Sequence, residues 1–461
     1  MQRLFAISWL TWKAALRFRL FVVVAVLLLA AVVGLPILIK DDGTARGFTQ
    51  ILLTYTLSAI TALLGLSTLW LACGTLARDI EDCTMQTVAV KPIARWQIWL
   101  GKWLGIMSLN AVLLALSGAS VYALLQWRAT KLPVAEQTVL RNEVLVARGS
   151  ARPVNVDQEV ATETERQMNE KLKSSPITTV DLPLLRKQIK EQVKAEFQLV
   201  PPGAGRVWHI DLGLARHFLR DQPLYLRIKF NAAEKSPSGT FTGMWQVGVP
   251  DSPTLWPSGP MSLAPDTFHE FEVPPNLFNA QGVLTVVFLN PNDTALIFPL
   301  EDGIEVLYPE GGFGLNFARG LGIIFCWMAV LATLGLAAAS FLSFPVAAFV
   351  ALGVLTLVFS TGTLSTVVEE GSILGWDSEK NQYSQTVLNY VAVPTFRGIL
   401  GVINLAKNFS PIDSLSTGRS VSWAELGRAV AQIVVLLGGL LAAFGIWTFS
   451  RRELATAQGN Q

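Results

Sequence analysis

Charged residues are scarce in this chain of 461 residues, where Asp, Glu, Lys and Arg together make up 15%. A soluble protein of this length carries about 25% charged residues, so an ordinary soluble chain is excluded. The shortage is local, because several apolar runs reach the roughly 20 residues that are needed to cross a bilayer. Together with a hydrophobic content of 51%, these runs predict a multi-pass membrane protein.

Catalytic and cofactor motifs are missing as well. The chain has no G-x-x-x-x-G-K-[ST] phosphate loop, so it cannot bind ATP by that route, and no H-E-x-x-H zinc motif. A net charge of +2 does not indicate a nucleic-acid partner. The cysteines are few and lie in or beside apolar runs, which argues against a disulfide framework or a zinc site: Cys73, Cys83 and Cys326. The chain is therefore predicted not to be an enzyme and to hold no metal or cofactor itself.

Six apolar runs are predicted to span the membrane, at about 20–39, 49–77, 99–126, 316–339, 345–367 and 427–449. The spans contain essentially no ionisable residue, which argues against a transporter driven by ion or proton coupling, because such transporters place ionisable groups at mid-membrane. Residues 2–19 precede the first span and predict an amphipathic helix at the membrane interface, with apolar side chains at helical spacing: Phe5, Trp9, Trp12 and Leu16.

Basic residues in the short flanks predict the orientation. The N-terminal helix, the segment 78–102 and the pair Arg451-Arg452 are all basic, and six spans place all three on one side. That side is the cytoplasm, so both termini are expected on the cytoplasmic side of a bacterial-type plasma membrane. The regions 127–315 and 368–425 then face outward. Within the second of these, 395–409 is a helical candidate, and Ser422 with Glu425 has the spacing of a capping box.

The outer region 127–315 divides into two patterns. Between about 157 and 198 one apolar stripe recurs every four residues and predicts helices: Leu185, Ile189, Val193 and Phe197. Between about 205 and 309 the period changes to two, as in LYLRIKF at 224–230, where Arg227 falls on the solvent side. Similar strands are RVWHIDL, FTGMWQVGV, FHEFEV, GVLTVVFL and GIEVLY. Their spacing favours an antiparallel β-sandwich of jelly-roll-like topology.

The fold class is therefore a membrane all-α part, residues 1–126 and 316–461, with an extracytoplasmic α+β domain between them. The sandwich holds every histidine, and ordinary surface or strand positions are favoured over a metal site for them: His209, His217 and His269. Its tryptophans could stack on a sugar, but their large area favours a buried core: Trp208, Trp245 and Trp256.

The segment 78–102, called the elbow from here on, is the only sizeable connection predicted on the cytoplasmic side. It carries in order Asp79, Glu81 and Asp82, then Thr84, MQTVAV, Lys91-Pro92, Arg95-Trp96 and Gly101-Lys102. This pattern resembles the loop after the second span in permease subunits of the type-2 family of ABC transporters. Arg451-Arg452-Glu453-Leu454 after the last span is similar to the usual ending of that family. Cys83 departs from the pattern, because a Gly before the Thr is common there.

The resemblance covers the membrane parts and leaves the outer domain unexplained. It implies an ABC exporter permease, paired with an identical or homologous second permease subunit, whose elbow docks on a separate ATP-binding subunit. Mixed charges there would set register and specificity, Met85, Val88 and Val90 would offer an apolar patch, and Pro92 would end a helix. The implied coupling residues are Arg78, Asp79, Glu81, Asp82, Thr84, Lys91, Pro92, Arg95 and Trp96. Two alternatives stay open: a solvated loop, and a membrane-anchored binding or assembly protein.

Overall fold

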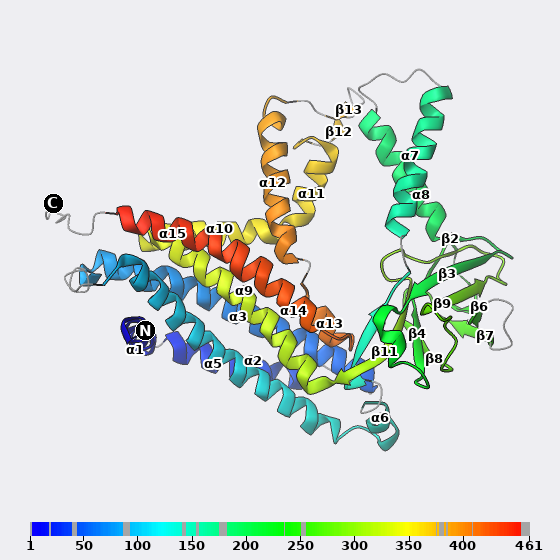
Figure 1. The fold of residues 1–461 in the computed structure, drawn as a ribbon, viewed down its shortest axis with the longest axis horizontal. Coiled ribbons are helices and arrows are strands. Elements are labelled where there is room, and N and C mark those ends of the chain that lie inside the picture. Colours follow the sequence, from blue (N-terminus) through cyan, green and yellow to red (C-terminus); the bar gives the residue numbers. More distant parts are fainter. Residues whose placement is uncertain are drawn as a thin grey trace. The chain divides into compact units, whose positions relative to one another are not determined.

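The computed structural model describes residues 2–17, 20–38, 44–85, 93–140, 144–153, 156–174, 182–234, 236–249, 255–374, 376–377, 382–383, 386–407 and 409–452. The chain separates into two compact units. The helical unit comprises Met1–Ala147 and Gly311–Gln461, and the sandwich unit comprises Arg148–Glu310 (Figure 1). Residues 127–147 of the predicted outer region therefore group with the helices.

The helical unit is a bundle in which α9 is central. Its helices are α1 (Gln2–Arg17), α2 (Leu20–Leu38), α3 (Ala45–Glu81), α5 (Arg95–Ala129), α6 (Val134–Val139), α9 (Phe313–Ala339), α10 (Phe344–Phe359), α11 (Thr361–Glu370), α12 (Asn389–Lys407), α13 (Pro411–Ser416), α14 (Trp423–Ala429), a π-helical segment (Val430–Gly438) and α15 (Gly439–Arg451). A short hairpin of β12 (Trp376–Asp377) and β13 (Gln382–Tyr383) lies between α11 and α12. Figure 1 shows α3, α5, α9 and α15 side by side.

Four described segments are long and apolar enough to cross a membrane: Gly47–Glu81, Arg95–Ala129, Phe313–Ala339 and Trp423–Arg451. The chain is therefore a multi-pass membrane protein. The predicted span 345–367 is instead a pair of helices, α10 and α11, bent by 62°. At the bend the Ser360 hydroxyl donates to the Thr356 carbonyl at 3.0 Å, and such back-bonding bends helices. In α2 the apolar helix is short, Val22–Leu35, so this criterion yields four or five spans rather than six.

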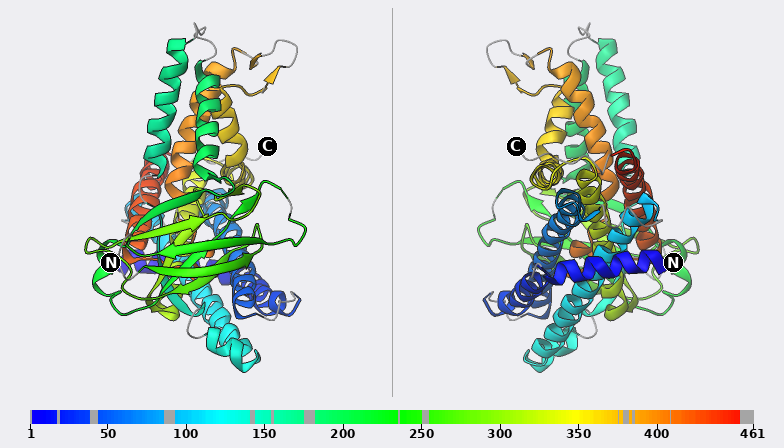
Figure 2. Two further views of the ribbon diagram at one scale, coloured as in Figure 1. Left: turned by 90° about the vertical axis from the view of Figure 1, so that its right-hand side faces the viewer. Right: turned by 90° about the vertical axis from the view of Figure 1, so that its left-hand side faces the viewer.

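Small residues allow the helices to approach closely. A Cβ added at Gly335 of α9 would lie 2.6 Å from the Ala72 Cβ of α3, so only glycine fits this crossing. Gly101 and Gly105 of α5 form a similar notch for α1, whose Ser8 hydroxyl donates to the Gly101 carbonyl at 2.9 Å. Figure 2 shows α1, the dark blue helix, running across the bundle.

The amphipathic face predicted for α1 is divided in two. Phe5, Trp9 and Leu16 are exposed, as expected for an interfacial helix. Trp12 instead turns toward α5, where its indole nitrogen donates to the Ser108 hydroxyl at 2.8 Å. The reason is the glycine notch of α5, which brings α1 close enough for side chains on that face to make direct hydrogen bonds.

The sandwich unit contains two four-stranded sheets, with strand orders β1-β11-β4-β8 and β3-β9-β6-β7. The strands are β1 (Val146–Ala151), β3 (Gly205–Asp211), β4 (Leu224–Ile228), β6 (Phe241–Val247), β7 (Trp256–Leu263), β8 (His269–Val273), β9 (Val283–Leu289) and β11 (Ile304–Gly312). The pairs β6–β7, β4–β8, β3–β9 and β1–β11 are nested in the chain. Nested pairing of eight strands is the rolled-up hairpin of a jelly roll, as the strand spacing predicted.

A third, smaller sheet joins β2 (Leu199–Val200), β10 (Leu296–Ile297) and β5 (Asn231–Ala232).

Two edge strands of the main sheets, β1 and β7, were not predicted. β7 carries Pro257 and Pro260, and β1 reads VARGSA. Proline is tolerated at a sheet edge, where one side of the backbone pairs with no other strand, so an edge strand need not show the usual alternation.

The core between the two main sheets is aromatic. Trp208 and Trp245 are buried and stacked with ring centroids 6.1 Å apart, and Phe288 and Phe298 complete the cluster. The preference for core over a sugar-stacking surface is confirmed for both tryptophans, and Trp256 is partly buried.

A helical hairpin of α7 (Val156–Ser174) and α8 (Leu182–Gln198) completes the sandwich unit. The predicted apolar stripe of α8 packs against α7, because Ile189 and Val193 are buried together with Val160 and Met168. Leu300, in the segment between β10 and β11, packs against the same cluster. This side chain therefore anchors the hairpin to the sandwich.

Candidate functional site

The elbow connects the end of α3 to the start of α5. Val88, Val90, Lys91 and Pro92 lie outside the described residues, while 78–85 and 93–102 are described. After Glu81 the chain turns at Cys83, whose φ of +58° lies in the left-handed region. Glycine reaches that region without strain, whereas another residue pays about 1 kcal/mol. The position where the resembled family commonly has Gly is thus one where the backbone itself favours Gly.

Asp79 and Lys102 join the two helices of the elbow. The Lys102 ammonium is 2.5 Å from Asp79 Oδ2 and donates to the Thr75 carbonyl at 2.7 Å. Lys102 is only 6% exposed, so its charge requires these partners. It also lies inside the predicted span 99–126, which corrects the expectation that the spans are essentially free of ionisable residues.

Glu81 and Arg78 hold the start of α10. A carboxylate oxygen of Glu81 accepts a hydrogen bond from the Phe344 N–H at 2.7 Å. Ser343, the residue before α10, makes no capping bond with its own side chain, so Glu81 supplies the cap from a different helix. The Arg78 guanidinium lies 4.4 Å from the centroid of the Phe344 ring, a cation–π contact. The end of α3 therefore fixes the position of α10.

Arg95 holds the end of the last helix. Its Nη1 donates to the carbonyls of Phe449, Ser450 and Arg452 at 3.0, 2.8 and 2.6 Å. Carbonyls at a helix C-terminus lack partners within the helix and carry partial negative charge, so a guanidinium is well suited to them. Arg452 in turn donates to Ala339 and Ser340 carbonyls at the end of α9, at 3.4 and 3.3 Å.

The remaining described coupling residues face solvent. Asp82, Thr84 and Trp96 are exposed, Trp96 to 46%. Thr84 also donates to the Asp79 carbonyl at 3.1 Å. Met85 is buried in the bundle core, so it does not belong to the predicted exposed patch. Of the predicted coupling residues that are described, four brace the bundle and three are available on the surface.

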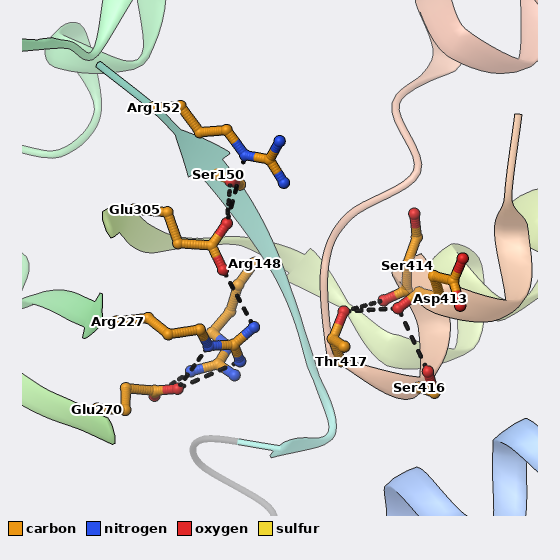
Figure 3. Close-up of polar contacts among 10 residues, drawn as sticks. All are labelled: Arg148, Ser150, Arg152, Arg227, Glu270, Glu305, Asp413, Ser414, Ser416 and Thr417. Atoms are coloured by element: carbon orange, nitrogen blue, oxygen red, sulfur yellow. Dashed lines mark hydrogen bonds and ion pairs between the residues drawn. The ribbon is translucent and has the colours of Figure 1, made fainter. Parts of the chain in front are cut away.

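A row of buried charges crosses the first sheet of the sandwich, one from each strand (Figure 3). Arg227 of β4 bonds to Glu305 of β11 at 3.2 Å and to Glu270 of β8 at 3.3 Å, and Arg148 of β1 pairs with Glu270. The Ser150 hydroxyl donates to Glu305 at 2.9 Å. Arg227 is buried, which corrects its predicted place on the solvent side of the strand.

This row was missed because alternation in one strand reports only which face a side chain occupies. A signal did exist, since the strand register sets Glu305 and Glu270 directly opposite Arg227. Reading it requires knowing which strands are neighbours. Cross-strand ion pairs of this kind hold strand register.

The other group of residues in Figure 3 lies at the end of α13, where the Thr417 hydroxyl donates to the Asp413 carbonyl at 2.6 Å.

A cleft of about 580 Å³ lies in the sandwich unit between α7, α8 and residues 299–302. Asp157 and Glu165 line the cleft from α7, Lys190 and Lys194 line it from α8, and Leu300 lines it from the segment 299–302. The volume is within the usual range for small-molecule sites. Among the described residues there is no group of three or more side chains able to hold a metal ion.

The histidines do not form a cluster in the described contacts. His209 Nδ1 lies 3.3 Å from the Thr285 hydroxyl, His217 contacts Arg216, and His269 Nε2 lies 2.7 Å from the Ala264 carbonyl. Each ring thus has its own local partner.

No protein-family model, curated protein or solved structure matches this chain.

Proposed function

We propose that this chain is the transmembrane permease subunit of an ATP-driven ABC exporter, powered by a separate ATP-binding subunit that docks on the elbow. The resemblance of the elbow to type-2 permeases is one support. The observation that carries the proposal is the bracing of the elbow: Glu81 caps α10, and Arg95 caps α15. A loop that only connects two spans has no need of such links.

The links provide a path for force. A partner that displaces the elbow moves the ends of α3 and α5, and through Glu81 and Arg95 also the start of α10 and the end of α15. Arg452 extends the path to α9. The exposed residues Asp82, Thr84 and Trp96 are left to contact the partner, where Trp96 would act as an aromatic anchor and Asp82 would favour a basic groove.

The topology in this proposal has six crossings. α2 and the bent pair α10–α11 supply the two crossings beyond the four long helices. The elbow and both termini face the cytoplasm of a bacterial-type plasma membrane, and the sandwich unit faces outward. A second permease subunit, identical or homologous, completes the path, and ATP is bound by the partner ATPase alone.

Cys83 offers a direct test, because it is exposed while Cys73 and Cys326 are buried. A thiol-reactive benzophenone attached at Cys83 in native membranes is expected to crosslink an ATP-binding subunit on illumination. Cys83→Ser is the matched control and should yield no crosslink. An impermeant maleimide should label Cys83 in inverted vesicles and not in right-side-out vesicles. A crosslink pattern without any ATP-binding subunit would overturn the proposal.

Arg95 tests the force path separately from docking. Arg95→Gln should leave the crosslink from Cys83 in place and abolish stimulation of the partner ATPase, because only the link to α15 is cut. Arg451→Gln is the control, since Arg451 is exposed and stacks on Trp447 at 4.4 Å without capping another helix. Unchanged stimulation in Arg95→Gln would contradict the proposed path.

The second candidate is a membrane-anchored extracytoplasmic binding or assembly protein, and the cleft of the sandwich unit favours it. In that case the cleft would be the working part and the helices a holder. Replacing Glu81 or Arg95 would then leave ligand binding intact, and Lys190→Ala in the cleft would remove it. The transport proposal expects instead that replacing Glu81 or Arg95 abolishes stimulation of the partner ATPase and that Lys190→Ala does not.

A further inference from the structure

Arg319 is a buried basic residue in a predicted membrane span. It is the seventh residue of α9, within the predicted span 316–339, and is 7% exposed. It lies about 30 Å along α9 from the elbow end of that helix, at a rise of 1.5 Å per residue. Ionisable residues in such segments are rare and usually functional, so Arg319 requires a physical account.

The surroundings of Arg319 include α13 and α14, which pack against α9 (Figure 1). The Trp423 ring of α14 lies over the guanidinium, 5.5 Å from its central carbon to the ring centroid. One turn before Arg319, Asn316 accepts from the Val421 N–H at 2.7 Å and donates to the Arg419 carbonyl at 2.9 Å. These bonds fix residues 419–421 beside this face of α9.

Within the described part of the chain, Arg319 makes no ion pair, and its Nε is buried without a hydrogen-bond partner. The hydroxyl of Ser420, in the segment that Asn316 fixes, is likewise buried without a partner among the described residues. Two buried donor groups, Arg319 Nε and the Ser420 hydroxyl, thus have no acceptor in the part of the chain that the structure describes. Burying a charge without a counter-charge is costly, so an external anion would stabilise this region by supplying the counter-charge.

We infer that Arg319 is the centre of a binding site for a phosphate group of the kind that phospholipid headgroups carry. A guanidinium presents a planar fork of donors that matches phosphate oxygens. The Ser420 hydroxyl, in the segment fixed beside this face of α9, would supply a further donor. Trp423 is exposed at the edge of the site, where a tryptophan fits the membrane–water interface and would cover a bound headgroup. The site is far from the elbow and stands whether or not the chain is a transport subunit.

The test uses the full chain purified in an uncharged detergent, with wild type, Arg319→Met, Arg319→Lys and Arg428→Gln compared. Arg428 lies on α14, is exposed, and serves as the matched control. The probes are phosphatidylglycerol, a glucosyl diacylglycerol without phosphate, and inorganic phosphate. Binding is measured by native mass spectrometry and by the shift of the thermal unfolding midpoint.

Phosphatidylglycerol is expected to raise the midpoint of wild type and Arg428→Gln, and its affinity should fall about tenfold or more in Arg319→Met, the loss of one charge-assisted contact. Arg319→Lys should retain part of the binding. Without lipid, Arg319→Met should unfold no earlier than wild type, because it removes an uncompensated charge. Full displacement of the lipid by inorganic phosphate would identify free phosphate as the ligand. Equal stabilisation of wild type and Arg319→Met by phosphatidylglycerol, or an equal effect of the phosphate-free lipid, would overturn the inference.

Discussion

Lys102 and Arg319 are two buried basic residues at opposite ends of the helical unit, and they differ in their partners. Lys102 is 2.5 Å from the Asp79 carboxylate and bonds to the Thr75 carbonyl. Arg319 has an aromatic ring over it and no ion pair among the described residues. The same cost of burial is met at the elbow by the protein and, in our inference, at the other end by a ligand. A buried charge by itself therefore indicates neither structure nor function, and its partner decides which.

The largest loss of stability is expected when a carboxylate is removed from the buried row of charges in the sandwich. Glu305 is 1% exposed and contacts Arg227, Arg152 and Ser150. Glu305→Gln should destabilise the sandwich unit by about 3 to 4 kcal/mol, because two buried guanidinium groups, Arg148 and Arg227, would then share the single carboxylate of Glu270. The thermal midpoint of the full chain, with the sandwich followed by limited proteolysis, measures this. A loss below about 1 kcal/mol would mean that the row is already compensated from elsewhere.

Breaking the Asp79–Lys102 ion pair of the elbow should also destabilise the protein, but by less. Asp79→Asn removes the counter-charge of Lys102, but Asp79 is 45% exposed in its side chain and the Thr75 carbonyl remains. We expect about 2 kcal/mol of destabilisation in detergent. Asp79→Asn combined with Lys102→Met should recover most of it. If Asp79→Asn unfolded no earlier than wild type, as we expect of Arg319→Met without lipid, the contrast between the two ends would fail.

Cys83 tests the backbone of the elbow without touching a charge. Cys83→Gly should stabilise the protein by up to about 1 kcal/mol, because glycine adopts the left-handed conformation without strain and loses part of that gain to chain entropy. Cys83→Ala is the control and should have little effect. The midpoints of the three proteins, measured side by side, check the order. Destabilisation by glycine would mean that the thiol makes a contact that outweighs the strain.

The smallest effect on stability is expected for an exposed ion pair, that of Glu163 with Arg166. Hydrogen bonds from Arg166, then from Gln167, lower the pKa of Glu163 in α7 from 4.5 to about 2. The folded state therefore binds its proton less readily than the unfolded state, and the stabilisation is present above pH 4.5 and lost as the pH falls toward 2. The protection factors of α7 amides, which are corrected for the intrinsic pH dependence of exchange, should fall over that window, and Glu163→Gln should remove this fall. The effect should be small, since the pair is solvent-exposed.

Local patterns were sufficient for much of the fold. The stripe of α8, the capping of α14 by Ser422 with the Glu425 N–H at 3.0 Å, and six strands of the jelly roll follow from periodicity and turn residues. These features depend on neighbours close in the chain, which is why a sequence can reveal them. The bend at Ser360 was missed because an apolar run reports the length of a span and not its straightness.

The roles of individual charges required the tertiary structure. The sequence by itself determined that this is a membrane protein with a jelly-roll domain and a polar elbow, because composition and periodicity respond to solvent and to lipid. Only the tertiary structure decided that Glu81 and Arg95 cap distant helices, that Arg227 is buried and that Arg319 makes no ion pair with any residue the structure describes. Burial and pairing depend on which segments meet in space, and these segments lie up to several hundred residues apart in the chain.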